Sequence, residues 1–301
     1  MKASNFNTIV KSHQLEEMKE YFDYFDKINY GELNYDGLWK WAGILDSFYK
    51  LYGNTTPNFN TCVDIGGGLS PIQLILSNYG KVINVDDCSH TGGKCLAWFP
   101  TRDMFYEESP GFDYKKENIE VIQKDFLTYI KSVPDNSIDL YVDGCSLIHF
   151  DVESEYSFHD GITEIAHHMN RTLKPGGHFI STCDVFNPVM RDKLPNILRN
   201  DGITYPHILF KVFCDSGLIP LDEADYNVDE FFSSIGNSHG WSHLDPTGVQ
   251  IPHYKKQNPK YSTRKDLPKY HSWQQWQEIY PGSGNTNGFP MLIARFVFTK
   301  N

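Results

Sequence analysis

A glycine-rich turn, set between a short apolar run and the start of a helix, is the strongest chemical signal in the sequence. It reads Cys62-Val63-Asp64-Ile65-Gly66-Gly67-Gly68-Leu69-Ser70-Pro71. Glycines let the backbone turn sharply and let a ligand approach main-chain N–H groups that a side chain would block. Ser70 can cap the next helix, and Pro71 suits its first position. The pattern predicts a nucleotide-binding turn that leads from a strand into a helix.

An acid at the end of the second predicted strand indicates what kind of nucleotide this turn binds. Asp86 lies about twenty residues beyond Gly66, where a carboxylate can accept hydrogen bonds from ribose hydroxyls. A dinucleotide-binding turn would have a third glycine at position 71, and Asp64 would repel its pyrophosphate. The same acid tolerates the cationic sulfonium and ammonium groups of S-adenosylmethionine. These residues favour the methyl donor over a nicotinamide dinucleotide.

Four ordered blocks between residues 61 and 183 resemble the class I S-adenosylmethionine-dependent methyltransferases. The blocks are Val63-Asp64-Ile65-Gly66-Gly67-Gly68, Ile83-Asn84-Val85-Asp86, Gln123-Lys124-Asp125-Phe126, and Ile138 to Phe150 followed by Leu173-Lys174-Pro175-Gly176-Gly177. The resemblance implies that the first block lines the methionine part of the donor and that the second holds the ribose. It implies that the Asp-Phe pair of the third block contacts the adenine.

The expected cofactor-binding residues follow from these blocks and from the acids beside them. They are Asp64, Gly66, Gly68, Asp86, Asp125, Phe126 and Asp143. One position departs from the family pattern, because Ser70 stands where many members have a further glycine. The expected cofactor is S-adenosyl-L-methionine.

Charge and cysteine usage predict a cytoplasmic protein that binds a small molecule. A net charge of −11 opposes binding to the phosphate backbone of nucleic acids. Six scattered cysteines without a CxxC pair argue for reduced thiols and against a structural zinc site. We find no stretch like a signal peptide and no run of eighteen apolar residues, so we expect no membrane association.

The apolar pattern predicts an α/β fold with a doubly wound, Rossmann-like sheet. We expect seven mostly parallel strands with an antiparallel last strand, N-terminal helices and an insert before the last strand. The strands are predicted at 62–65, 81–86, 119–123, 138–143, 178–182, 218–224 and 289–299. Helices are predicted at 72–79, 160–173 and 205–217, with two more within 14–52.

Three units are predicted along the chain. Residues 1–55 form a helical lid, residues 56–229 with 289–301 form the donor-binding core, and residues 230–288 form a substrate-specificity insert. The insert is rich in tryptophan, tyrosine and histidine, whose rings suit sugars or aromatic substrates. The same rings could instead form a small core of the insert itself.

Methyl transfer needs an acceptor that is held close and aligned, and a hydroxyl acceptor also needs a base. His149 is the first candidate for that base, because Ser146-Leu147-Ile148-His149-Phe150 follows the fourth strand at the open edge of the sheet. Asp184, after the fifth strand, is the second predicted catalytic residue.

A metal-assisted mechanism is the alternative for the two acids at the ends of the fourth and fifth strands. Asp143 and Asp184, with Asn187 nearby, could hold Mg²⁺ beside two substrate oxygens. Without metal, Asp184 would cap a loop and Asp143 would accept backbone or substrate hydrogen bonds. We prefer this reading and predict no metal.

These observations together predict an S-adenosylmethionine-dependent methyltransferase that O-methylates a small or medium polar acceptor, such as a sugar or a sugar-bearing metabolite. The alternatives are an N-methyltransferase of a small metabolite and a catalytically silent donor-binding module. A nicotinamide-dependent oxidoreductase is disfavoured by Pro71 and by the block from Leu173 to Gly177.

Overall fold

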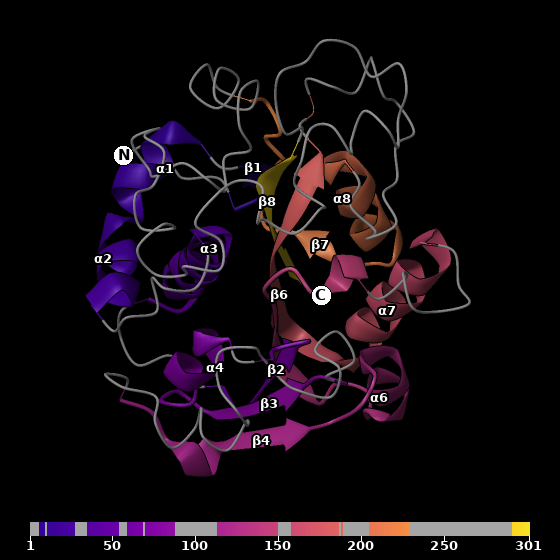
Figure 1. Ribbon diagram of the computed structural model, residues 1–301. Coiled ribbons are helices and arrows are strands. Elements are labelled where there is room, and N and C mark those ends of the chain that lie inside the picture. The colour runs from indigo at the N-terminus through magenta and orange to yellow at the C-terminus, as the bar shows by residue number, and fades with distance from the viewer. Residues whose placement is uncertain are drawn as a thin grey trace, which may run out of the picture.

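The computed structural model describes ten segments of the chain, which together form one mixed sheet with flanking helices (Figure 1). These segments are residues 6–9, 11–27, 35–53, 59–68, 70–87, 113–149, 158–186, 188, 205–228 and 291–301. The predicted insert at 230–288 lies outside the described residues, as does most of the connection between the second and third predicted strands.

Five parallel strands form the centre of the sheet. They are β2 (Thr61–Ile65), β3 (Lys81–Val85), β4 (Ile119–Ile122), β5 (Ile138–Asp143) and β6 (Leu173–Phe186). The order β6-β5-β2-β3-β4 places β2 in the middle. The chain first builds outward from β2 to β4 and then returns to β5 on the other side of β2. This doubly wound order confirms the predicted fold, and its switch point lies between β2 and β5.

Antiparallel pairing completes the sheet on the β6 side. β8 (Met291–Thr299) runs antiparallel to β6 along its whole length, as predicted for the last strand. β7 (Ile219–Pro220) and β1 (Thr8–Ile9) both pair with β8. β1 adds an eighth strand to the seven predicted ones, and its two residues are too few to give a period-two pattern.

The boundary between the covering helix and β6 differs from the prediction. The helix α7 (Phe158–Thr172) ends at Thr172, and β6 begins at once, five residues before the predicted start at 178. Thr172 Oγ1 bonds to the His168 carbonyl oxygen at 2.8 Å and to the Tyr141 hydroxyl at 2.7 Å. Gly176, expected in a turn before the strand, lies inside β6 with a φ of +75°.

Helices cover both faces of the sheet (Figure 1). On one face lie α3 (Tyr35–Tyr52) and α4 (Pro71–Leu76), and α1 (Ser12–Glu17) and α2 (Lys19–Lys27) precede α3. The other face is covered by α6 (Phe126–Ser132), α7 and α8 (Pro206–Asp215). The described residues also contain two short 3-10 helices, η3 (Lys116–Asn118) and η4 (Leu147–His149). α6 is a helix that the sequence pattern did not predict.

Aromatic side chains fill the core between α8 and the sheet. Phe213 of α8 packs edge-on against Phe179 of β6 at 5.0 Å and against Phe298 of β8 at 5.4 Å. All three rings are buried. Contacts of this kind hold β6 against α8, and they help to position the side chains at the carboxyl end of the strand.

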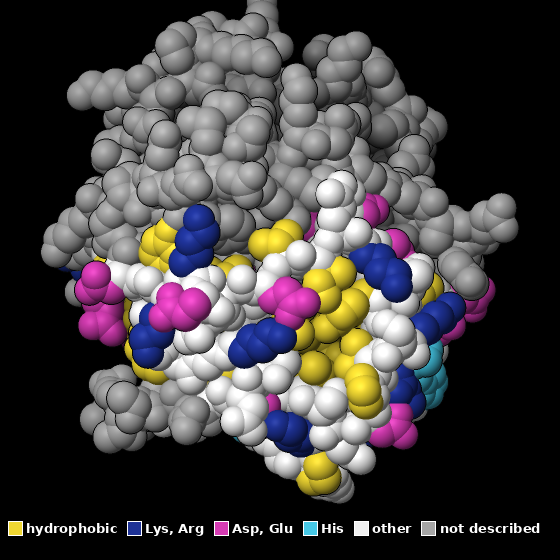
Figure 2. Space-filling view, turned by 90° about the horizontal axis from the view of Figure 1, so that it is seen from below, with side chains coloured by type: hydrophobic (Ala, Val, Ile, Leu, Met, Phe, Trp, Pro, Cys, Tyr) yellow, Lys and Arg dark blue, Asp and Glu magenta, His cyan; other side chains and the backbone are white. Residues whose placement is uncertain are grey.

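Charges of both signs lie interspersed on the described part of the face in Figure 2, with hydrophobic side chains between them. Val121 of the edge strand β4 is one of the larger hydrophobic side chains that the described residues expose. None of the helices in the described segments has the length and apolar character needed to cross a membrane.

Candidate functional site

The predicted glycine turn after β2 and the loop after β5 border the switch point between these two strands. Gly66 has a φ of +55°, and its N–H donates to the carbonyl oxygen of Val85 at 2.7 Å. Ser146 Oγ donates to the carbonyl oxygen of Gly66 at 2.9 Å. A Cβ added at Gly66 would lie 2.4 Å from Ser146 Cβ, so only glycine fits this position.

Asp86 holds the same turn from the end of β3. Its Oδ2 accepts a hydrogen bond from the N–H of Gly68 at 2.8 Å, and Gly68 also has a positive φ of +46°. The structure thus brings together two residues that the sequence assigned to the donor. Contact of Asp86 with a ribose stays a prediction.

The helix after the turn begins as the sequence predicts. Ser70 Oγ accepts a hydrogen bond from the N–H of Ile72 at 3.2 Å, and Pro71 occupies the first helical position. α4 ends at Leu76, and turns follow to Gly80. The cap fixes where the glycine turn ends and the helix begins.

Two buried amides brace the turn from below, and sequence reasoning missed both. Asn84 Nδ2 donates to the Gly68 carbonyl oxygen at 2.9 Å and to Gln73 Oε1 at 2.7 Å, and Gln73 Nε2 donates to the same carbonyl at 3.3 Å. Both side chains are fully buried. The signal in the sequence is an asparagine inside the apolar run Val82-Ile83-Asn84-Val85.

Asp64 lies directly under the turn as a buried acid. Its Oδ2 accepts no hydrogen bond from the described residues, and a Cβ added at Gly67 would approach this oxygen to 2.5 Å. Burial raises the pKa of Asp64 well above its usual range, and the charges of Asp143 and Asp86 raise it further. Three carboxylates therefore converge on this turn, and the arrangement suits a cationic ligand.

Asp143 closes the loop after β5. Its Oδ1 accepts hydrogen bonds from the N–H groups of Ser146 at 2.7 Å and Leu147 at 3.1 Å, and Ser181 Oγ donates to Oδ2 at 2.6 Å. Burial raises the pKa of Asp143 to about 6, although these hydrogen bonds and the charge of Lys40 oppose the rise. Asp143 thus shapes the switch point by holding its loop.

Asp184 has different neighbours from Asp143. The register pairs Asp143 with Ser181, so Asp184 lies three residues further along β6. Lys40 Nζ of α3 lies 2.9 Å from Asp184 Oδ2. Within the described segments, no group of three or more histidine, cysteine or acidic side chains is arranged to hold a metal ion. Asn187, the third residue of the metal alternative, lies outside these segments.

The remaining predicted site residues lie on η4 and α6. His149 is the last residue of η4, directly after β5, and its side chain lies outside the described residues. Asp125 caps α6 by accepting a hydrogen bond from the N–H of Thr128 at 2.7 Å. Phe126 is 1% exposed, with its ring edge-on to Tyr141 at 6.2 Å. The catalytic role of His149 and the adenine contacts of Asp125 and Phe126 stay predictions.

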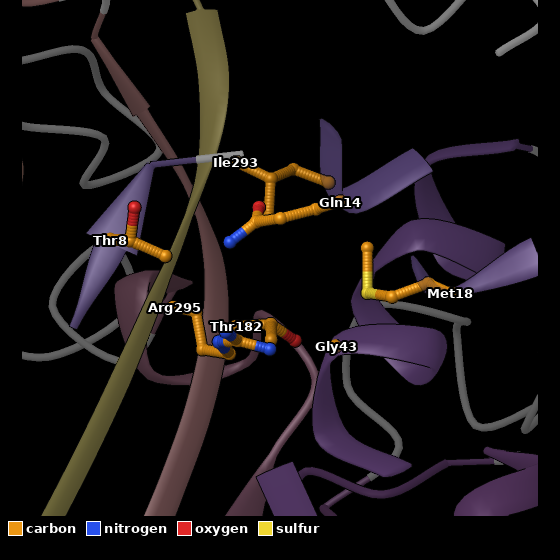
Figure 3. Close-up of a pocket in the computed structure, with 7 residues that line it drawn as sticks. All are labelled: Thr8, Gln14, Met18, Gly43, Thr182, Ile293 and Arg295. Carbon is orange, nitrogen blue, oxygen red and sulfur yellow. The ribbon is translucent and has the colours of Figure 1, made fainter. Parts of the chain in front are cut away.

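A separate cavity of about 20 Å³ lies between α1, α3 and the strands β1, β6 and β8 (Figure 3). Gln14 is 4% exposed, and its Oε1 accepts a hydrogen bond from the N–H of Lys11 at 2.9 Å. This bond fixes the orientation of the amide, so its NH2 group faces the cavity. A space of this size holds one or two water molecules. The lining residues are Thr8, Gln14, Met18, Gly43, Thr182, Ile293 and Arg295.

Comparison with known proteins finds distant matches among solved structures only. No family model matches the sequence, and no curated protein matches it significantly. A phosphoethanolamine N-methyltransferase 2 of Haemonchus contortus is 14% identical with a TM-score of 0.48, and the match covers 86% of this chain and 52% of that one.

Two bacterial structures give similar values. A geranyl diphosphate C-methyltransferase from Streptomyces coelicolor A3(2) is 11% identical over 85% of this chain and 75% of that one, with a TM-score of 0.46. The YcgJ protein from Bacillus subtilis is 16% identical over 85% and 97%, with a TM-score of 0.45. At this level of likeness, the function has to be argued from the residues of this chain.

Proposed function

We propose that this protein is an S-adenosylmethionine-dependent methyltransferase. The observation that carries the proposal is the set of three carboxylates around a glycine turn at the switch point of a doubly wound sheet. Ligands of such sheets bind outside the carboxyl ends of the strands at this point. Asp64 offers a buried oxygen that accepts no hydrogen bond from the described residues, and a cation beside it would favour its ionised form, whereas the negative charge of a pyrophosphate would be unfavourable beside these three acids.

The glycines of the turn fit the proposed role as well as the charges do. Gly66 and Gly68 both have positive φ values, so they give the chain the sharp turn that a nucleotide-binding loop needs, and Ser146 leaves no room for a side chain at Gly66. Asp86 stands at the end of β3, where a ribose would lie. When bound, the donor would supply a methyl group attached to a positively charged sulfur. The acceptor would attack the methyl carbon in line with the carbon–sulfur bond, and the sulfur would leave as a neutral thioether.

For the acceptor, we propose a small or medium polar molecule, with a sugar hydroxyl as the first choice and a small amine as the alternative. His149 is the proposed base because it follows β5 at the open end of the sheet. Asp184 is the proposed second residue on the acceptor side. Residues 230–288 are proposed to supply acceptor specificity, and residues 1–55 to cover the donor.

Calorimetry with the purified full chain tests the donor directly. We expect S-adenosylmethionine and S-adenosylhomocysteine to bind with one site per chain, and NADH not to bind. Mass spectrometry of small molecules released from the denatured protein provides an independent measurement. Uptake of NADH in place of both nucleosides would overturn the proposal.

A further inference from the structure

A lysine, an acid and a cysteine from three different elements meet at the carboxyl ends of β5 and β6. Lys40 Nζ donates to Asp184 Oδ2 at 2.9 Å, and the Cys145 thiol donates to the same oxygen at 3.4 Å. The N–H of Asp184 donates back to Cys145 Sγ at 3.3 Å. Two side-chain donors therefore meet at one oxygen of the carboxylate, and the backbone of the same residue bonds to one of them.

The backbones of all three residues are fixed. Thr182 Oγ1 donates to the carbonyl oxygen of Lys40 at 3.1 Å, and this bond joins α3 to β6 at Lys40. Cys145 adopts a φ of +83°, a conformation that costs a non-glycine residue about 1–3 kcal/mol and that recurs at functional sites. This conformation places its sulfur against Asp184.

The position of the cluster relates it to the switch point. Cys145 is flanked in sequence by Gly144 and Ser146, and Ser146 holds the glycine turn. The Asp184 side chain keeps 20% of its surface exposed, compared with 10% for Lys40. The acid is thus the more accessible partner of the pair, and its strand β6 lies next to β5, whose following loop contains Ser146.

We propose that Lys40 is a positioning residue that holds Asp184 as an oriented carboxylate, and that Asp184 accepts a hydrogen bond from an O–H or N–H group of the acceptor. This inference rests on the proposed function and names the two side chains that would select an acceptor with a polar hydrogen. A cation beside a carboxylate favours its ionised, accepting form. An acceptor that reacts at carbon has no polar hydrogen on its reacting atom for this contact.

The transfer step balances with these groups. The acceptor oxygen or nitrogen uses a lone pair to form the new bond to the methyl carbon while the carbon–sulfur bond breaks. The sulfur keeps the electron pair of that bond. The proton of the acceptor passes to the Asp184 carboxylate and from there to water, so this inference gives Asp184 the role of base for which His149 was the first candidate.

Four variants separate this role from a structural one. They are Lys40→Met, Lys40→Arg, Asp184→Asn and the control Lys50→Met. Lys50 lies on the same helix and pairs with Asp46 at 2.7 Å, away from the switch point. The assay follows an isotopically labelled methyl group from S-adenosylmethionine to small amines, alcohols, sugars and carbon nucleophiles. Donor affinity and unfolding temperature are measured for each variant.

We expect label on O–H and N–H compounds only. Lys40→Met and Asp184→Asn should lower kcat about 100-fold with donor affinity preserved, measured below the unfolding temperature of each variant, and Lys40→Arg should restore most of the rate. Lys50→Met should leave the rate unchanged.

Four results would overturn the inference. They are an unchanged rate in Lys40→Met, an equal loss in Lys50→Met, label on carbon alone, and no transfer to any O–H or N–H compound by a protein that binds the donor. If the unmodified chain does not bind S-adenosylmethionine, that result would instead contradict the proposed function.

Discussion

Ser146 Oγ and the carbonyl oxygen of Gly66 lie 2.9 Å apart, and this hydrogen bond joins the loop after β5 to the glycine turn after β2. The two residues are 80 positions apart in the chain. Their contact joins the two loops that border the switch point, so the shape of the proposed donor site depends on both loops.

Gly66→Ala should therefore abolish donor binding and destabilise the fold. The new alanine would have to adopt a positive φ, and its Cβ would lie 2.4 Å from Ser146 Cβ. The control is Gly176→Ala, because Gly176 has a similar positive φ of +75° and no atom within 4 Å of an added Cβ. We expect a loss of about 1 kcal/mol in the control and a larger loss in Gly66→Ala, measured by urea unfolding. Equal losses would contradict the steric argument.

Asp86→Ala should weaken the binding of S-adenosylmethionine about 10-fold or more. The substitution removes both the acceptor that holds the Gly68 N–H at 2.8 Å and the carboxylate proposed for the ribose. The neighbouring Asp87→Ala is the control, since Asp87 is exposed. Calorimetry gives the dissociation constants, and identical values for the two variants would show that Asp86 does not contribute.

Asp64→Asn should become more stable relative to the unmodified protein as the pH rises. Because burial raises the pKa of Asp64, the folded state binds its proton more tightly than the unfolded state does. The unmodified protein then loses stability as the pH rises above the usual aspartate range, while the uncharged asparagine does not. Urea unfolding between pH 4 and pH 8 checks this, with Asp87→Asn as control, and a difference that is constant with pH would contradict it.

Asp143 adds a second contribution of the same sign with a defined window. Its pKa of about 6 lies above the ordinary value, so stability falls between about pH 4 and pH 6 and is level above that range. Asp143→Asn keeps an acceptor for the N–H groups of Ser146 and Leu147 and should remove this fall. The same unfolding series measures it, and an unchanged slope in the variant would refute the assignment.

Arg295→Met should cost about 1.5–3 kcal/mol of stability. Arg295 Nη1 and Asp46 Oδ2 lie 2.5 Å apart, and both side chains are nearly buried at 6% and 7% exposure. Loss of Arg295 removes one of two cations beside this buried carboxylate, because Lys50 Nζ still lies 2.7 Å from the same oxygen. Lys131→Met is the matched control, because Lys131 pairs with Glu164 on the surface and such pairs contribute about 1 kcal/mol or less. An effect of Arg295→Met no larger than that of the control would show that Lys50 and water compensate the charge of Asp46.

The turn, its cap and the parallel strands were predictable because each is encoded locally. Ser70, Pro71 and the glycines act on residues next to them in the chain, and the strands are short apolar runs bounded by breakers. The helix α6 was missed although its cap, Asp125, was identified, because the residue was assigned to the donor and not to a helix start. One short polar residue can serve either purpose.

The contacts that shape the site were not predictable from local pattern. Lys40 and Asp184 are 144 residues apart, and Asp46 and Arg295 are 249 apart. The sequence shows charged residues at these positions, but only the register of β6 and β8 and the placement of α3 on them decide which charges meet. The same holds for Asp143 and Asp184, which lie near the carboxyl ends of adjacent strands as expected but bond to different side chains, Ser181 and Lys40 respectively.

The fit of α3 on β6 has a consequence for how substrates reach the switch point. A Cβ added at Gly43 would lie 3.0 Å from Thr182 Cγ2, so glycine at this position lets α3 approach β6 closely. This contact and the hydrogen bond from Thr182 to the Lys40 carbonyl oxygen would both have to break before α3 could move away from the strand. We therefore expect any movement that admits reactants to the proposed site to come from a part of the chain other than α3.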